Sequence, residues 1–261
     1  MSALRTLRVL SCVALTAASL AAHAGRSCEN KAPTVDAIQR SMALAESTAK
    51  KLDATGARVV VLARAGQNLS EYGLRYSHLG FAYRGANGWR VVHKLNQCGS
   101  ARAAIYRQGL GEFFLDDPFE YVAAIAVLTP EVQARLLPEL TVNARLAQLN
   151  TPAYSVVAYP WALTYQQSNQ WAIETLAMTQ DPAASTRERA QAWLKLQGYQ
   201  PTTLRISAFK RLGARMTAAN VAFDDHPNDK RFSDRIETVT ADSVFAWLNR
   251  SGLGGPVQVI R

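Results

Sequence analysis

The sequence predicts an α+β fold in which a small antiparallel sheet packs against helices. Two observations support this class. The first is a hairpin signal, in which strand-like runs at 77–83 and 89–95 flank the turn residues 84–88. The second is that stretches with helical 3–4 spacing of apolar residues are interspersed with strands, without a strict βαβ repeat.

The expected elements can be given in chain order. Apolar residues at helical spacing predict a helix over 34–54, which Gly56 ends. A buried strand at 59–63 follows, and then the hairpin strands at 77–83 and 89–95. The middle of the chain contains a loop at 112–118 with two anchored aromatic residues, a helix at 130–146 with a break at Pro138, a strand at 154–158 and a helix over 165–177 after a polar entry. The last part contains a helix from a capping box at 185–188 to Gly198, a strand at 203–207, an acidic loop at 223–229, a strand at 236–240 and a helix ending near Gly252.

The hairpin carries two histidines, His78 and His93, one on each strand. If Ala86 and Asn87 are the two loop residues, the pairing places Gly80 opposite His93. Side chains alternate between the faces of a sheet, so this register puts both histidines on one face as diagonal neighbours. Gly80 then leaves that face open between them. A one-residue bulge would place the histidines on opposite faces.

The N-terminus has the pattern of a secretory signal peptide. Arg5 and Arg8 precede an apolar run at 9–21 that is too short to span a bilayer comfortably, and Ala22–Ala24 is an A-x-A cleavage site. We therefore expect residues 1–24 to be removed and 25–261 to form a single domain, located in the periplasm or secreted. No later segment has the length and hydropathy of a transmembrane helix.

The charge balance indicates which partners the exported chain would meet. The formal net charge is +9, and removal of Arg5 and Arg8 leaves +7. This charge is compatible with anionic polymers of the cell envelope, and we expect a cell-wall peptide or another envelope polymer as a partner. We do not expect nucleic acid, because the chain has no dense basic block and export removes that partner.

Two cysteines, Cys28 and Cys98, remain after the predicted cleavage. In an oxidising compartment such a pair usually forms a disulfide, which here would tie the N-terminal arm to the loop after the second hairpin strand. The alternative is that Cys98, five residues after His93, is a thiolate nucleophile.

A set of three residues has the chemistry that acyl transfer requires. His78 is the candidate base, His93 the group that orients it, and Ser168 the candidate nucleophile at the start of a helix. A helix N-terminus offers free N–H groups to a developing oxyanion.

The order of these residues resembles the circularly permuted papain-like fold of the NlpC/P60 superfamily. A strand with S-H-x-G is followed by a polar residue on the next strand and then by a nucleophile that opens a later helix. More closely, the chain resembles a family of exported bacterial proteins of unknown function over most of 25–250. The matching stretches are 74–81, 92–99, 168–171 and 224–227.

The resemblance implies a papain-like amidase, hydrolase or acyltransferase acting on amide or ester bonds, without a cofactor. It also implies a binding role for residues around the site, namely Gly80, Asn169, Gln170, Asp225 and His226. The superfamily's nucleophile is cysteine, whereas this chain has Ser168. A serine hydroxyl is much harder to ionise and needs a stronger base and a formed oxyanion hole.

Simpler interpretations stand beside the catalytic one. Ser168 would also serve as a helix N-cap, His78 as a hydrogen-bonded core residue and His93 as a surface residue. The motif at 224–226 is typical of a solvated turn, and Trp171 of a core anchor. Zinc held by both histidines and a carboxylate is a further alternative, which the absence of H-E-x-x-H disfavours. Beside a hydrolase, the chain could be an inactive relative that binds peptide or glycan, or an envelope scaffold.

Overall fold

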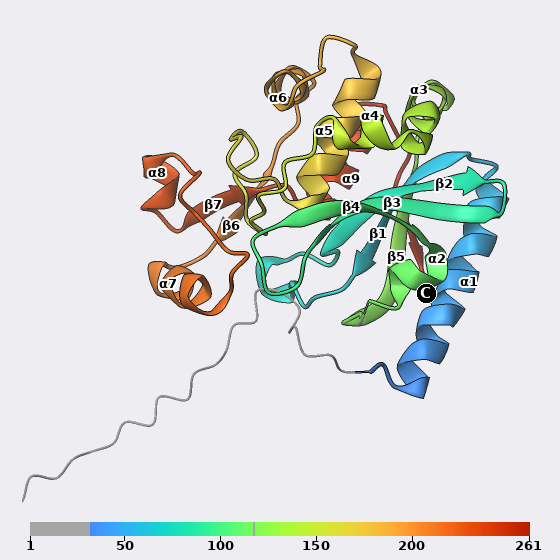
Figure 1. The fold of residues 1–261 in the computed structure, drawn as a ribbon, viewed down its shortest axis with the longest axis horizontal. Helices are drawn as coiled ribbons and strands as arrows, with labels where there is room; N and C mark the ends of the chain where they lie inside the picture. The colour runs from blue at the N-terminus through green and yellow to red at the C-terminus, as the bar shows by residue number, and fades with distance from the viewer. Residues whose placement is uncertain (1–31, 117) are drawn as a thin grey trace, which may run out of the picture.

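The computed structural model describes residues 32–116 and 118–261. Its main feature is a six-stranded sheet with the spatial order β4-β3-β2-β1-β5-β8, in which all neighbours are antiparallel (Figure 1). The strands are β1 (Val59–Ala65), β2 (His78–Gly85), β3 (Gly88–Asn96), β4 (Ala103–Gly109), β5 (Glu120–Val127) and β8 (Gln258–Ile260). Strand β4 is therefore an edge strand.

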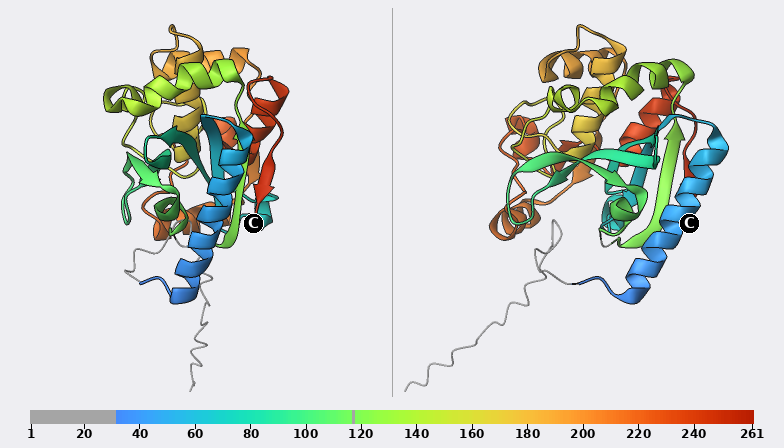
Figure 2. Two further views of the ribbon diagram at one scale, coloured as in Figure 1. Left: turned by 90° about the vertical axis from the view of Figure 1, so that its right-hand side faces the viewer. Right: turned by 45° about the vertical axis from the view of Figure 1, so that its right-hand side comes forward.

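Helices cover both faces of this sheet (Figures 1 and 2). One face packs against α1 (Val35–Thr55) and the short α2 (Leu110–Phe114). The other carries α3 (Pro130–Thr141), α4 (Asn143–Ala147), α5 (Ser168–Gln180), α6 (Arg187–Leu196) and α9 (Ala241–Arg250). We refer to these as the α2 face and the α5 face.

Alternation along the strands assigns each side chain to a face. On β1, Val59 and Val61 belong to the core of the α5 face, whereas Val60 and Leu62 belong to the core of the α2 face. On β2, Phe81 packs edge-on against Trp171 of α5, with ring centroids 6.3 Å apart. The central strands are thus buried on both sides, which gives continuous apolar runs rather than an alternating pattern.

A smaller lobe lies beside the main sheet. It contains the antiparallel pair β6 (Thr202–Arg205) and β7 (Arg235–Thr238), with α7 (Ala208–Thr217) and α8 (Asn228–Arg231). The lobe has its own small apolar cluster around Phe223 and Ile236. In the part of the chain described here, no helix combines the length and apolar character needed to cross a membrane.

The predicted α+β class is confirmed, and most predicted elements are present near their expected bounds. Three expectations are wrong. Residues 154–158 form no strand; Ser155 instead exchanges hydrogen bonds with the backbone of Ala222. The loop expected at 112–118 overlaps α2, although its two aromatic residues are buried as expected. Helix α3 continues through Pro138 and ends at Thr141.

Candidate functional site

The hairpin has the register that the turn signal predicts. Gly85 pairs with Gly88, and Phe81 pairs with Val92, so His93 lies opposite Gly80. A Cβ atom on Gly80 would lie 2.7 Å from the Cβ of His93, so the space that the sequence predicts to be open is filled by β3 and only glycine fits here. The rings of both histidines therefore lie on the α2 face, with His78 Nε2 2.8 Å from His93 Nδ1.

Hydrogen-bond partners determine the tautomers of the two rings. Gln108 donates from Nε2 to Glu112 Oε1, so its Oε1 accepts from His93 Nε2 at 2.7 Å. Because His93 Nε2 carries the proton, His93 Nδ1 accepts from His78 Nε2. A polar chain thus runs from Glu112 through Gln108 and His93 to His78, whose Nδ1 lone pair has no hydrogen bond among the described residues.

Both histidines are kept neutral by their surroundings. Burial, followed by the nearby positive charge of Arg64, lowers the pKa of His93 to about 3 and that of His78 well below its usual range. Arg64 lies directly opposite His78 on β1 and forms an ion pair with Asp116. Phe113 closes the cluster, with ring centroids 5.1 Å from His93 and 6.1 Å from His78. The expectation of a surface position for His93 is wrong, since its exposed fraction is 0%.

Ser168 belongs to the opposite side of the sheet. It is the first residue of α5, which covers the α5 face, and it is 4% exposed. Tyr154 lies beside it, and burial raises the pKa of that tyrosine. The structure therefore brings the two histidines together but places Ser168 across the sheet from their rings. Ser168 is not the N-cap either, because the side chain of Gln167 caps α5 by accepting from the backbone of Asn169.

The two residues after Ser168 serve the packing of α5. Asn169 accepts from the backbone N–H of Leu79 at 3.0 Å and donates to Val239, so it fixes the helix start against β2. Gln170 donates to the carbonyl of Pro160 and to Glu174. Both side chains are buried, and neither faces the histidine pair.

Asp225 and His226 lie in the smaller lobe rather than at the hairpin. His226 Nδ1 is 2.9 Å from Asp225 Oδ1, and His226 Nε2 is 2.9 Å from the carbonyl of Glu237. Asp225 also accepts from the backbone N–H of Tyr159. Both side chains are fully buried, so the expectation of a solvated turn is wrong for these two residues; they fasten the loop to β7.

The remaining sequence candidates concern cysteine and metal. Cys28 lies outside the described residues, so its pairing with Cys98 stays a prediction. Among residues 32–116 and 118–261, no group of three histidine, cysteine, aspartate or glutamate side chains is arranged to hold a metal ion.

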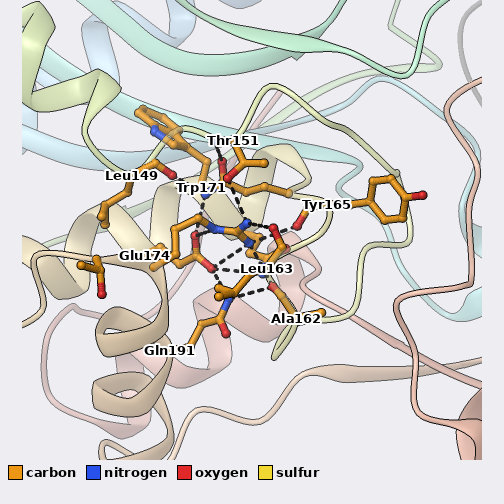
Figure 3. Close-up of polar contacts among 12 residues, drawn as sticks. Leu149, Thr151, Ala162, Leu163, Tyr165, Trp171, Glu174 and Gln191 are labelled. Atoms are coloured by element: carbon orange, nitrogen blue, oxygen red, sulfur yellow. Dashed lines mark hydrogen bonds and ion pairs between the residues drawn. The ribbon is translucent and has the colours of Figure 1, made fainter.

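A second buried polar cluster lies on the α5 face (Figure 3). Its centre is the ion pair between Arg187 Nε and Glu174 Oε2 at 2.8 Å, and Glu174 is 0% exposed. Gln166 links this pair to Lys94, whose Nζ also donates to the carbonyl of Thr151. Burial, and then the charge of Arg187, lowers the pKa of Lys94 to about 7.

This cluster holds loops in place rather than facing solvent. The guanidinium of Arg187 donates to three backbone carbonyls of the segment before α5, those of Ala162, Leu163 and Tyr165. Gln191 of α6 donates to Glu174 at 2.8 Å. Because every guanidinium nitrogen has an acceptor, the buried charges stabilise one arrangement of α5, α6 and this segment.

A surface hollow of about 410 Å³ lies between the edge strand β4 and α4. It is lined by Ile105, Tyr106, Arg107, Asn143, Leu146, Ala147 and Asn150. Arg107 donates to Asn143 and to the carbonyl of Leu140, which positions its guanidinium at the hollow. Arg107 Nε and Asn150 Oδ1 are buried without a hydrogen-bond partner among the described residues. Native structures rarely leave such atoms unpaired.

Sequence reasoning missed the partners of the histidines and the hollow. Gln108 and Glu112 are four residues apart, but they span the junction of β4 and α2, so no single periodicity connects them. A usable signal was Lys94, a lysine on a strand in which positions 91, 92 and 95 are apolar. Its burial at 0% exposure shows that it needed partners from another element.

A comparison with protein-family models identifies the family of this chain. The family model described as "Uncharacterized protein conserved in bacteria (DUF2145)" matches residues 51–248. No curated protein and no solved structure matches the chain.

Proposed function

Because the chain belongs to the family of uncharacterized proteins conserved in bacteria, we propose its function from the arrangement of its own residues. We propose that it is an exported cell-envelope protein that binds an extended, acidic peptide and does not cleave it. The observation that carries the second half of this proposal is the placement of Ser168 across the sheet from the rings of His78 and His93.

Acyl transfer needs the nucleophile within about 2.6–3.2 Å of its base, or across one water molecule. Here Ser168 is the first residue of α5, which packs on the α5 face of the sheet. His78 Nε2 is hydrogen-bonded to His93, and both rings pack against Phe113 on the α2 face. We propose that this chain lacks the nucleophile–base pair of the papain-like proteins that its sequence resembles.

The hollow beside β4 supports the binding half of the proposal. In the described part of the chain, residues 104–109 pair with β3 on one side and with no strand on the other. An exposed sheet edge can accept an extended peptide through main-chain hydrogen bonds, and adjacent pockets supply specificity. The guanidinium of Arg107 at this edge favours a ligand with a carboxylate. Cell-wall stem peptides have both an extended backbone and free carboxylates.

Calorimetric titration of the purified protein with a synthetic cell-wall stem tetrapeptide tests the proposal. We expect saturable binding that weakens at least about tenfold in Arg107→Ala, because a charge-assisted hydrogen bond contributes roughly 1.5–3 kcal/mol. The matched control is Arg205→Ala, an exposed arginine of the smaller lobe, which should bind as the parent protein does. Asn143→Ala provides a second hollow variant if Arg107→Ala is unstable. Absence of binding, or equal affinity in all variants, would contradict the proposal.

A further inference from the structure

Helix α7 presents an apolar face to solvent. Phe209, Leu212 and Met216 are 87%, 59% and 79% exposed, and no residue of this helix is buried. At 100° per residue these three positions lie within about 60° of one another, so they form one continuous stripe. A soluble surface helix normally has the opposite arrangement, with its apolar stripe turned toward the core.

The back of α7 is held to the smaller lobe by polar contacts. Arg211, on the side away from the stripe, donates to the carbonyls of Arg231 and Ser233. These two carbonyls flank Phe232, which is 75% exposed. The outward direction of the stripe is thus fixed by the packing of the lobe. We call Phe209, Leu212 and Met216 the α7 patch.

Positive charge flanks the stripe. Lys210 and Arg215 lie about 100° and 120° from Phe209 on the two sides of the helix, and both are exposed. Residues 205–217 contain four basic residues and no acidic one. Lys210 forms an ion pair with Glu71, and Arg205, which is 77% exposed, lies 3.9 Å from Asp234. Arg215 is exposed as well.

We propose that the α7 patch docks the protein on the surface of an anionic lipid bilayer. Aromatic, leucine and methionine side chains on one face of a helix, with long cationic side chains along its borders, are the arrangement of helices that lie in the membrane interface. The apolar stripe enters the boundary between headgroups and acyl chains. The arginine and lysine side chains extend along the helix toward the lipid phosphates.

Co-sedimentation of the purified protein with vesicles tests this proposal. Vesicles of phosphatidylglycerol and phosphatidylethanolamine should bind the protein, binding should weaken with added salt, and phosphatidylcholine vesicles should bind it less. The double variant Phe209→Ser/Leu212→Ser should reduce the partition coefficient at least about tenfold, because two apolar side chains no longer enter the interface. Arg215→Glu should reduce binding to the anionic vesicles only.

The matched control is Leu196→Ser on α6, which removes a leucine that is 81% exposed and lies away from the patch. It should bind vesicles as the parent protein does. Circular dichroism should show all variants folded, because the substituted side chains lie outside the core. Binding that is absent, or that is the same in the double variant, would overturn the proposal. So would a concentration-dependent dimer, measured by light scattering, that the double variant abolishes, since the patch would then bind a second copy.

Discussion

Gly80 determines how closely the two histidines approach. A side chain at this position would meet both the Cβ of His93 and the carbonyl of Val92, each 2.7 Å from the added carbon. Both contacts are with groups close to the backbone, so neither can move without distorting β3. The neutral His78–His93 pair therefore depends on a glycine that has no φ requirement of its own and is needed only for space.

Gly80→Ala should lower the free energy of unfolding by about 1–3 kcal/mol, as expected for overpacking a tightly packed position. Urea denaturation measures this change. The control is Gly109→Ala, because an added Cβ there has open space within 4 Å. It should change stability by no more than about 0.5 kcal/mol. Equal effects of the two substitutions would contradict the close approach of β2 and β3.

The lowered pKa values of His78 and His93 predict how stability depends on pH. In the unfolded chain these side chains take up a proton near pH 6.5, whereas the folded protein keeps His93 neutral to about pH 3. The unfolded state therefore binds more protons as the pH falls. Stability is fully present above pH 6.5 and decreases below it, by up to about 1.4 kcal/mol per pH unit for each histidine.

The chemical shifts of the histidine ring protons in nuclear magnetic resonance spectra measure the protonation of each ring directly. Neither His78 nor His93 should titrate between pH 7.5 and about pH 5. Denaturation at the same pH values should show the free energy of unfolding decreasing toward the acid side. A ring that titrates near pH 6.5 would show that the pair is hydrated rather than buried.

For individual residues, the sequence could predict the register of the hairpin but not the surroundings of the two histidines. The turn at 84–88 and the alternation of side chains suffice to place His78 and His93 on one face. The helices that cover that face, α1 and α2, lie outside the hairpin, at 35–55 and 110–114. The position of Arg64 opposite His78 in the β1–β2 pair and the contact of Phe113 with the His78 ring are tertiary contacts, and no local sequence pattern indicates them.

Among the helices and strands, α5 depends most on polar contacts. Almost all of it is buried, and its carboxylate Glu174 accepts from Gln166, Gln170, Arg187 and Gln191. A buried pair of this kind contributes little to net stability but makes the removal of one partner costly. The helix position is thus fixed by hydrogen bonds as well as by the packing of Trp171.

Glu174→Ala should destabilise the protein by about 3–5 kcal/mol, because it leaves the guanidinium of Arg187 buried without its counter-ion. Thermal unfolding followed by circular dichroism measures the loss. Glu188→Ala, an exposed acidic residue in the first turn of α6, is the control and should cost no more than about 1 kcal/mol. Similar melting temperatures for the two variants would show that the Arg187 ion pair is not buried in solution.

There are physical reasons why the sequence did not indicate some of the strands. Strand β5 consists mainly of alanine, valine and isoleucine and is buried on both faces, so its run does not alternate. Strand β4 is an edge strand of mixed polarity. The run at 154–158 has strand composition, but its backbone N–H groups donate to Ala101, Asn220 and, within the run, Ser155, and they form no ladder with a neighbouring strand.

For the whole molecule, the sheet lies between two helical layers, and this placement determines on which side of the sheet each candidate residue lies. The sheet separates the histidine pair from Ser168. Both lie near the start of β2, because Asn169, the residue after Ser168, accepts a hydrogen bond from Leu79, the residue after His78. Sequence order alone suggested that the three would meet. Which side of the sheet α5 covers cannot be read from its own residues, because its buried positions surround the helix.

The N-terminal expectations also apply to the whole chain. Cleavage after Ala24 and a bond between Cys28 and Cys98 predict that the exported protein begins at Gly25 and contains no free thiol. Intact mass and thiol titration under denaturing, non-reducing conditions check both. A product that retains Met1, or two titratable thiols, would contradict export with a disulfide and would return Cys98 as a candidate nucleophile.

The central claim is that the protein binds a peptide without cleaving it. The most direct measurement is to incubate the protein with a cell-wall stem tetrapeptide, separate the complex and weigh the recovered peptide by mass spectrometry. We predict that the peptide co-elutes with the protein and is recovered at its original mass, and that Ser168→Ala behaves in the same way. Cleavage products from the parent protein that are lost in Ser168→Ala would contradict the account, because they would require Ser168 to act as a nucleophile.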